Sequence, residues 1–299
     1  MPSADDTAIA SYWRRFRRVL EHIDANLEGD LSLEALSGVA AYSKFHFHRQ
    51  FAALFDMGVH EYVQRLRMRR AAHQLAFREP LRIIDVALAA GYESHEAFSR
   101  AFRKAMGQSP SQFRSRPQWE LWSAKHEPLC NLRSQYMKPR YAPEDVSIVE
   151  FPETPIGVLE HRGDPRRLGE TIRTFIEWRK QNGLHPSVSA TFNIFHDNPE
   201  VTAPEAFRMD LCAAVKGPLA SNSLGVVAKV IPGGRCAVLR HKGSDDTLGD
   251  AVSYLYATWL PGSGHSPRDF PLFAQRVAMF PDVPEHEAIT DVFLPLERR

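Results

Sequence analysis

Apolar side chains recur at helical spacing through the first third of the chain. Between residues 12 and 27 the steps alternate between three and four residues, which places five side chains on one helical face: Trp13, Phe16, Leu20, Ile23 and Leu27. The same pattern predicts helices at residues 33–39, 44–54, 60–77, 83–90 and 95–106. Ser32, Ser43 and Ser94 precede three of them as N-caps, and Gly29, Gly58 and Gly91 mark breaks.

One arrangement occurs twice in this region. A short apolar helix is followed by a tight turn, a serine cap and a helix with a polar outer face, which is the pattern of a helix-turn-helix. The helix that joins the two units is about 25 Å long at 1.5 Å per residue. It can therefore hold two recognition helices about 34 Å apart, one turn of DNA. We expect a single chain to read two successive major-groove segments of an asymmetric site.

The outer faces of the two capped helices carry the candidate DNA-binding side chains. Arginine can bond guanine through two parallel hydrogen bonds, and histidine and serine can donate to bases or phosphates. The other interpretation is that these are only solvated helix faces, but their repetition in tandem favours DNA. The candidates are Lys44, Phe45, His48, Arg49, His95, Glu96, Ser99, Arg100 and Arg103.

The second half alternates strand and helix patterns and contains an internal repeat. The segment 158–170 aligns without gaps to 238–250, an offset of 80 residues, and the same offset pairs Pro152 with Pro232. Each copy reads as strand, turn, strand, His-x-Gly turn, helix and two later strands. Residues 119–143 lose helical periodicity after Trp122 and gather prolines, which predicts a linker.

These patterns predict two domains and a linker. The fold expected is an all-α N-terminal domain at 1–118, with two helix-turn-helix units joined by a long helix, and an α+β C-terminal domain at 144–299. In the latter, a duplicated strand-helix-strand-strand module forms a pseudo-two-fold domain with a sheet-lined cleft.

Composition and charge agree with this division. The 43% apolar and 24% charged residues are typical of a globular protein and exclude a disordered one. The net charge of +1 divides into +4 for residues 1–118 and −3 for residues 119–299. No apolar run is long enough to span a membrane, and the acidic N-terminus does not resemble a signal peptide. With three widely spaced cysteines, the sequence predicts a cytoplasmic protein with no metal and no cofactor.

The first half resembles the AraC/XylS family of transcription regulators. The resemblance covers residues 11–114 and rests on YSKFHFHRQF (42–51), YVQRLRMRRAAHQL (62–75) and IIDVALAAGYESHEAFSRAFRKAMGQSPSQFR (83–114). It implies that the candidates on the two outer faces lie where family members touch DNA. It also favours activation by a monomer, with RNA polymerase as a further partner, but it does not give the target sequence.

The second half, over residues 146–297, resembles the GyrI-like, or SHS2-duplicated, effector-binding domain. A DNA-binding half followed by such a domain is similar to the domain order of the right-origin-binding type of regulator. Such domains bind amphipathic or cationic small molecules and have a glutamate in the last strand, where this chain has Asp291. The resemblance implies a pocket in which Asp291 attracts a cation and aromatic side chains line the walls. The alternative is that the aromatics fill the core and that the carboxylates bond local backbone. The candidates are Asp291, Phe293, Trp259, Tyr256, Trp178 and Asp210.

Two histidines have a predicted structural role, and two other functions stay open as alternatives. His161 and His241 begin turns before helices and are interpreted as turn residues, not as ligands or bases. The leading hypothesis is a ligand-responsive transcription regulator that is not an enzyme. A small-molecule hydrolase stays an alternative, because two carboxylates near an aromatic pocket can do acid–base work, and so does a protein-interaction module.

Overall fold

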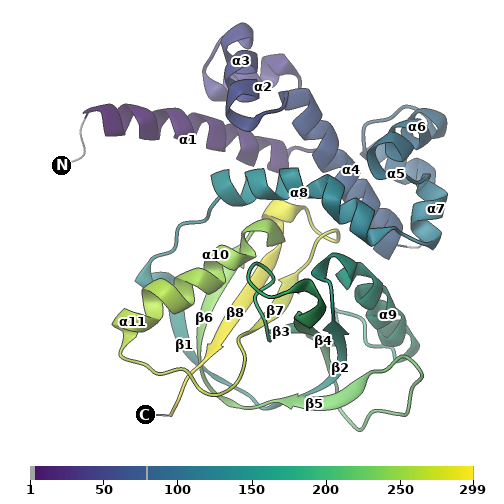
Figure 1. Cartoon of the computed structure of the whole chain (residues 1–299), viewed down its shortest axis with the longest axis vertical. Helices are drawn as coiled ribbons and strands as arrows, with labels where there is room; N and C mark the ends of the chain where they lie inside the picture. The colour runs from purple at the N-terminus through teal and green to yellow at the C-terminus, as the bar shows by residue number, and fades with distance from the viewer. Residues whose placement is uncertain (1–3, 79, 299) are drawn as a thin grey trace. The chain divides into compact units, whose positions relative to one another are not determined.

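The computed structural model describes residues 4–78 and 80–298. The chain divides into two compact units: a helical one, Met1–Lys138 with Pro284–His286, and a sheet-containing one, Pro139–Val283 with Glu287–Arg299 (Figure 1). None of the helices in the described part of the chain is long and apolar enough to cross a membrane.

The helical unit follows the pattern expected from the sequence. Its helices are α1 (Ala4–Ala25), α2 (Leu33–Ala40), α3 (Lys44–Phe55), α4 (Val59–Phe77), α5 (Ile83–Ala89), α6 (His95–Met106), α7 (Pro110–Ser115) and α8 (Trp119–Tyr136). The pairs α2–α3 and α5–α6 are the two helix-turn-helix units, and α4 joins them (Figure 1). The inward stripe of α3 ends on Phe55, which is buried and lies one residue beyond the expected end of this helix, whereas Leu54 is only half-buried.

Each helix-turn-helix unit has its own hydrophobic core, and α4 contributes to both. Its first half, with Tyr62 and Leu66, packs in the core of the first unit around Phe47 and Phe51. Its second half, including Leu75, packs in the core of the second unit. Because one continuous helix belongs to both cores, the two units are held at a fixed spacing along it.

Helix α8 corrects the linker expected at residues 119–143. The structure keeps this segment helical from Trp119 to Tyr136, through Pro128, and loses the helix only afterwards. Trp119 packs in the core of the second unit, and Leu129 and Leu132 pack in the core of the first. The segment is therefore a second helix that spans both cores.

A buried ion pair fastens α8 to α1. Both terminal nitrogens of Arg133 bond the carboxylate of Asp24, at 2.8 and 3.0 Å, and Arg133 Nη1 also donates to the hydroxyl of Tyr62 at 3.2 Å. The side chains of Arg133 and Asp24 are 2% and 6% exposed. Desolvation lowers the pKa of an arginine, but the facing carboxylate outweighs it and raises the pKa of Arg133.

The sheet domain, Pro139–Val283 with Glu287–Arg299, contains an eight-stranded antiparallel sheet in the described residues. The strand order is β1-β6-β8-β7-β3-β4-β2-β5. Its strands are β1 (Val146–Phe151), β2 (Thr154–Arg162), β3 (Thr191–Phe195), β4 (Arg208–Ala214), β5 (Val227–Ile231), β6 (Gly234–Lys242), β7 (Phe273–Ala278) and β8 (Ile289–Pro295). Helix α9 (Leu168–Gln181) follows β2. After β6 come α10 (Leu248–Ser253), the π-helix η5 (Tyr254–Trp259) and α11 (Leu260–Ser263).

The strand order confirms the duplicated module and its pseudo-two-fold arrangement. The order reads the same from either end once β1–β4 are matched with β5–β8: β1 and β5 lie at the two edges, and β3 and β7 meet at the centre. The first strand of each module is exchanged: β1 pairs with β6, and β5 pairs with β2. Only a short turn separates β1 from β2 and β5 from β6, yet β1 and β5 each pair with a strand of the other module.

The two faces of the sheet are packed differently. Trp178 of α9 packs with Leu159 and Leu211 on one face, and Leu255 of η5 packs with Val292 in the second module. Side chains alternate along a strand, so the opposite face carries the other residues of each strand. Its centre is a cluster of phenylalanine rings, among them Phe151, Phe192, Phe273 and Phe293.

The two His-x-Gly turns have the structural role expected for them. His161 Nε2 lies 3.2 Å from the carbonyl oxygen of Asp164, and His241 Nε2 lies 3.0 Å from that of Ser244. Burial lowers the pKa of His241. In both modules the imidazole closes the turn that leads into the helix.

Candidate functional site

Serine caps and left-handed turns place the two recognition helices. In the first unit Ala41 has a φ of 54°, and the hydroxyl of Ser43 accepts from the amide of His46 at 3.4 Å. In the second unit Gly91 has a φ of 82°, a conformation that glycine adopts without strain, and Ser94 caps α6 through the amide of Ala97 at 3.2 Å. Counted from these caps, α3 and α6 match residue for residue.

The outer face of α3 presents an aromatic ring beside an arginine. Phe45 is 64% exposed, and the guanidinium of Arg49 lies over its ring, 5.3 Å from the centroid. His48 is exposed on the same face, and Lys44 forms an exposed ion pair of 2.8 Å with Glu34. The outer face of α3 therefore offers an apolar ring and a guanidinium side by side.

The outer face of α6 is polar throughout. His95, Glu96, Arg100 and Arg103 are exposed, whereas Ser99 is half-buried. A hydrogen bond from its own backbone amide, followed by one with Ser94, lowers the pKa of Glu96 and keeps its carboxylate charged. A charged acceptor therefore stands one turn before Arg100.

The match between the helices shows where the two units agree and where they differ. At an offset of 51 residues Arg49 corresponds to Arg100, so both faces carry an arginine at the same position. Phe45 corresponds to Glu96, so an apolar ring in one unit is replaced by a carboxylate in the other. All the residues expected to touch DNA lie on these two helices.

The six residues expected in the ligand pocket are not brought together. Asp210, Asp291 and Phe293 belong to the sheet face that carries the phenylalanine cluster. Trp178 is 1% exposed in the core between α9 and the other face, where its indole lies against Gly157. Trp259 packs in the core of the second module, and Tyr256, on the same helical segment, is 44% exposed.

Asp291 already has a partner. Both of its oxygens accept from Arg240, its cross-strand neighbour on β6, at 2.7 and 2.8 Å. The carboxylate is 14% exposed and the arginine 61%. A cation would therefore have to compete with an arginine that is itself free to move into water.

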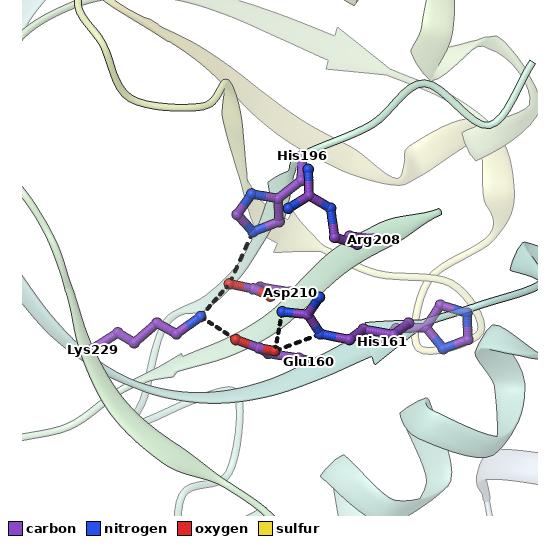
Figure 2. A pocket seen from close by; sticks show the side chains of 7 residues that line it. Glu160, His161, His196, Arg208, Asp210 and Lys229 are labelled. Atoms are coloured by element: carbon purple, nitrogen blue, oxygen red, sulfur yellow. Dashed lines mark hydrogen bonds and ion pairs between the residues drawn. The ribbon is translucent and has the colours of Figure 1, made fainter. Parts of the chain in front are cut away.

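A charged cavity lies in the first module, beside Asp210 (Figure 2). Its volume is about 120 Å³, and its lining consists of Glu160, His161, Arg162, His196, Arg208, Asp210 and Lys229. Lys229 of β5 donates to Glu160 at 2.6 Å and to Asp210 at 3.1 Å, and Figure 2 shows its amine between the two carboxylates. His196 Nε2 lies 3.2 Å from the same Asp210 oxygen.

The carboxylates of this cavity are held in the charged state. Burial on its own would raise the pKa of Asp210, but hydrogen bonds from His196 and Lys229 outweigh it and lower that pKa. Hydrogen bonds from Lys229 and then Arg162 lower the pKa of Glu160. Burial disfavours the ammonium, yet the two carboxylates raise the pKa of Lys229.

Sequence reasoning found Asp210 but missed Glu160, His196 and Lys229. A signal for Glu160 was present, since the gap-free repeat alignment sets it against Arg240 and so marks a change of charge at a matched position. Lys229 gave no such signal, because its contact with Glu160 depends on the exchange of β5 into the first module. No group of three or more His, Cys, Asp or Glu side chains in the described residues could hold a metal ion.

Comparison with known proteins matches both halves of the chain. Residues 144–297 match the family described as the GyrI-like small molecule binding domain, and residues 36–116 match a helix-turn-helix domain. These matches confirm the AraC-type and GyrI-like resemblances and the fold class expected from the sequence.

Of three curated relatives, two are transcription proteins by name and the third is named for binding an origin. The chain is 40% identical to the "Probable transcriptional regulator YgiV" of Escherichia coli K12 over 153 residues, which is 51% of this chain and 96% of that protein. It is 34% identical over 96 residues to the "HTH-type transcriptional activator AarP" of Providencia stuartii, covering 32% and 70%. It is 31% identical over 110 residues to the "Right origin-binding protein" of E. coli K12, covering 36% and 37%.

Proposed function

The chain belongs to the GyrI-like small molecule binding domain family, and from that premise we propose that it is a transcription regulator that reads DNA with α3 and α6 under the influence of a small ligand. The observation that carries the proposal is the pair of matched outer faces, each with an exposed arginine at the same distance from its serine cap. The DNA-binding region is residues 1–118 and the ligand region is residues 144–299.

The chemistry of the two faces supports reading of different bases. Arg49 and Arg100 each suit guanine, which offers two acceptors in the major groove. Phe45 suits the methyl group of thymine, and Glu96 suits the amino group of cytosine. Phe45 and Arg49 are four residues apart, as are Glu96 and Arg100, which is about 6 Å along the helix at 1.5 Å per residue. The two bases read by each helix therefore lie one or two base pairs apart. The expected site has two unlike halves.

The packing of α4 supports binding by a monomer. Because α4 belongs to the cores of both units, one chain carries two recognition helices at a fixed spacing. A second copy is not needed to reach the next major-groove segment. The regulator then acts on DNA in the cytoplasm.

We propose that the protein activates transcription. The relative AarP is named an activator, and a monomer on an asymmetric site has a defined orientation from which to contact RNA polymerase. The outer faces of α3 and α6 are used for DNA, so such a contact falls to other surfaces of the chain.

The ligand region binds its effector through the sheet face that carries Asp210, Asp291 and Phe293. The helix aromatics Trp178, Tyr256 and Trp259 are omitted, because they pack on or point away from the opposite face. We propose binding without turnover, because Asp210 already accepts a hydrogen bond from Lys229 and Asp291 from Arg240.

The alternative functions are separable by experiment. Steady hydrolysis of an ester or lactone by the wild type, lost in Asp291→Asn, would identify a hydrolase. A stoichiometric protein partner held by residues 144–299 would identify an interaction module.

The test of the proposal is selection of binding sequences from a random duplex library with the full-length protein at about 150 mM salt, where non-specific binding is weak. Arg49→Ala should relax the preference in one half of the selected site and Arg100→Ala in the other, each at a cost of about 1–3 kcal/mol. Arg140→Ala, which removes an exposed charge that belongs to neither recognition helix, should select the wild-type site. Equal weakening on every sequence would make the two arginines phosphate contacts and refute their role as readers.

A further inference from the structure

Arg67 of α4 connects the two helix-turn-helix units to each other. Its Nε donates to the carbonyl oxygen of Leu27 at 2.9 Å, and its Nη2 donates to that of Gly29 at 3.4 Å. Both carbonyls belong to the segment between α1 and α2, and Leu27 packs against the core of the first unit. The same guanidinium lies against the turn of the second unit, since a Cβ added to Gly91 would be 3.0 Å from Nη1. One side chain therefore contacts both units.

The position of this guanidinium is set from the side of the first unit. A guanidinium is planar and presents its donors in a fixed fork, so the bonds to two carbonyl oxygens determine how the plane is oriented. An ion pair fastens the same segment to α4: Arg70 Nη2 lies 2.6 Å from an oxygen of Glu28, the residue between Leu27 and Gly29. The guanidinium of Arg67 is thus a rigid support for whatever packs on it.

The turn at Gly91 decides where the second recognition helix begins. Gly91 has a φ of 82°, and Ser94, the N-cap of α6, follows three residues later. The next residue of the turn, Tyr92, donates through its hydroxyl to the side chain of Gln64 at 3.3 Å. Gln64 and Arg67 are three residues apart and so lie on the same side of α4. Both attachments of the turn therefore come from that side of the helix.

The shared helix alone does not fix the rotation of one unit relative to the other. α4 sets their distance along its axis, because it belongs to both cores. Apolar packing is non-directional, whereas hydrogen bonds weaken steeply when they are misaligned. A rotation of the second unit about α4 would move Gly91 away from the guanidinium or into it. The guanidinium cannot follow without losing its bonds to Leu27 and Gly29.

We propose that Arg67 is a positioning residue for DNA recognition, which fixes the rotation of the second unit about α4 and thereby sets the spacing of the two half-sites that one chain reads. The inference rests on the proposed function, since it concerns how α3 and α6 act together. Two linked binding modules gain affinity from each other only when the geometry lets both engage. Arg67 acts through the placement of α6 and not by contact with a base.

The experiment measures how strictly the protein requires one spacing. The full-length protein is titrated by fluorescence anisotropy on its selected duplex and on duplexes with one base pair added or removed between the halves. One base pair shifts the halves by about 3.4 Å and turns them by about 34°. The wild type should lose at least about tenfold in affinity, because one helix no longer meets its bases. Arg67→Met should bind the selected duplex about tenfold more weakly and lose at most about threefold more on the altered ones.

Two further variants separate the contact from the charge. Arg65→Met is the matched control, because Arg65 lies on the same helix but bonds only Glu61 of that helix in the hydrogen bonds given for its side chain. This variant should keep the wild-type spacing requirement. Arg67→Lys keeps the charge and loses the planar fork. It should relax the requirement as Arg67→Met does, and it provides the test if the methionine variant does not fold.

Binding to single half-sites distinguishes positioning from folding. On duplexes in which one half is scrambled, Arg67→Met and Arg67→Lys should bind the remaining half as the wild type does. A wild-type spacing requirement in both Arg67 variants would overturn the inference. Selective loss of binding at the half-site read by α6 would overturn it as well, because Arg67 would then only keep the second unit folded.

Failure of this inference differs from failure of the proposed function. If the wild type requires one spacing and the Arg67 variants require it equally, other contacts align the two units and the regulator proposal stands. If the wild type shows no preference among DNA sequences, the proposed function fails, and the inference fails with it.

Discussion

The exposed ring of Phe45 leads to a prediction that can be tested with a single methyl group. If the ring contacts a thymine methyl, then replacing that thymine by deoxyuridine removes the contact and leaves base pairing intact. The removed group is about the size of one methylene, worth about 0.8 kcal/mol when buried, which corresponds to about a fourfold loss of affinity. Phe45→Ala removes the other partner of the same contact.

The loss expected for Phe45→Ala is larger. An aromatic side chain has about 200 Å² of surface, of which 64% is exposed here, and DNA can cover about half of that exposed area. At about 25 cal/mol per Å² the contact is worth about 1.6 kcal/mol, or about fifteenfold in affinity. Loss of the ring beneath the Arg49 guanidinium adds to this figure if the arginine becomes less ordered.

The assay is fluorescence anisotropy on four combinations: wild type and Phe45→Ala, each on the selected duplex and on its deoxyuridine form. The fourfold penalty should appear with the wild type and vanish with the variant, because the methyl then has no partner. Leu88→Ala is the control: Leu88 is 56% exposed but lies on α5, outside the recognition helices, and this variant should keep the penalty. An equal deoxyuridine penalty with and without the ring would show that Phe45 does not contact the thymine methyl.

Two further predictions concern the packing on which both sites depend. Gly157→Ala should destabilise the sheet domain by about 1–3 kcal/mol, because the new Cβ would lie 2.5 Å from the Trp178 ring. Gly249→Ala, where nothing lies within 4 Å, is the control and should be neutral or stabilising by up to about 1 kcal/mol. Thermal melts measure both, and equal melting temperatures would contradict the close packing of Trp178 on Gly157. Arg133→Met should cost about 3–5 kcal/mol in denaturant unfolding, because it removes one partner of the buried Arg133–Asp24 ion pair. A cost below about 1 kcal/mol would contradict a stabilising role for this pair.

Local patterns predicted the helical domain well. The serine caps and the spacing of apolar residues fix α2, α3, α5 and α6 to within a residue or two, because capping and amphipathic packing depend on neighbours in sequence. Helix α8 was missed for the opposite reason. Its interior includes Pro128, which is unfavourable in a helix, and the buried face includes the charged Arg133. Only the cores against which it packs make this segment helical.

The repeat predicted the sheet domain but not its site. Matching sequence at a constant offset showed that the modules are equivalent, and the strand order confirms it. It did not show that β1 and β5 are exchanged, and this exchange is what brings Lys229 to Glu160. Nor did composition show that Trp178 packs behind the sheet. The sequence does not distinguish an aromatic residue that lines a pocket from one that fills the core, because it does not show which face of the sheet each one packs against.

In the proposed regulator, one chain reads two unlike major-groove segments through two helix-turn-helix units on a common helix. The direct measurement is the stoichiometry and affinity of the full-length protein on its selected duplex and on a duplex with five base pairs inserted between the two halves, about half a turn of DNA. We expect one chain per duplex, two halves of different sequence, and loss of specific binding on insertion. Two chains on a palindromic site, or undiminished affinity after the insertion, would contradict it.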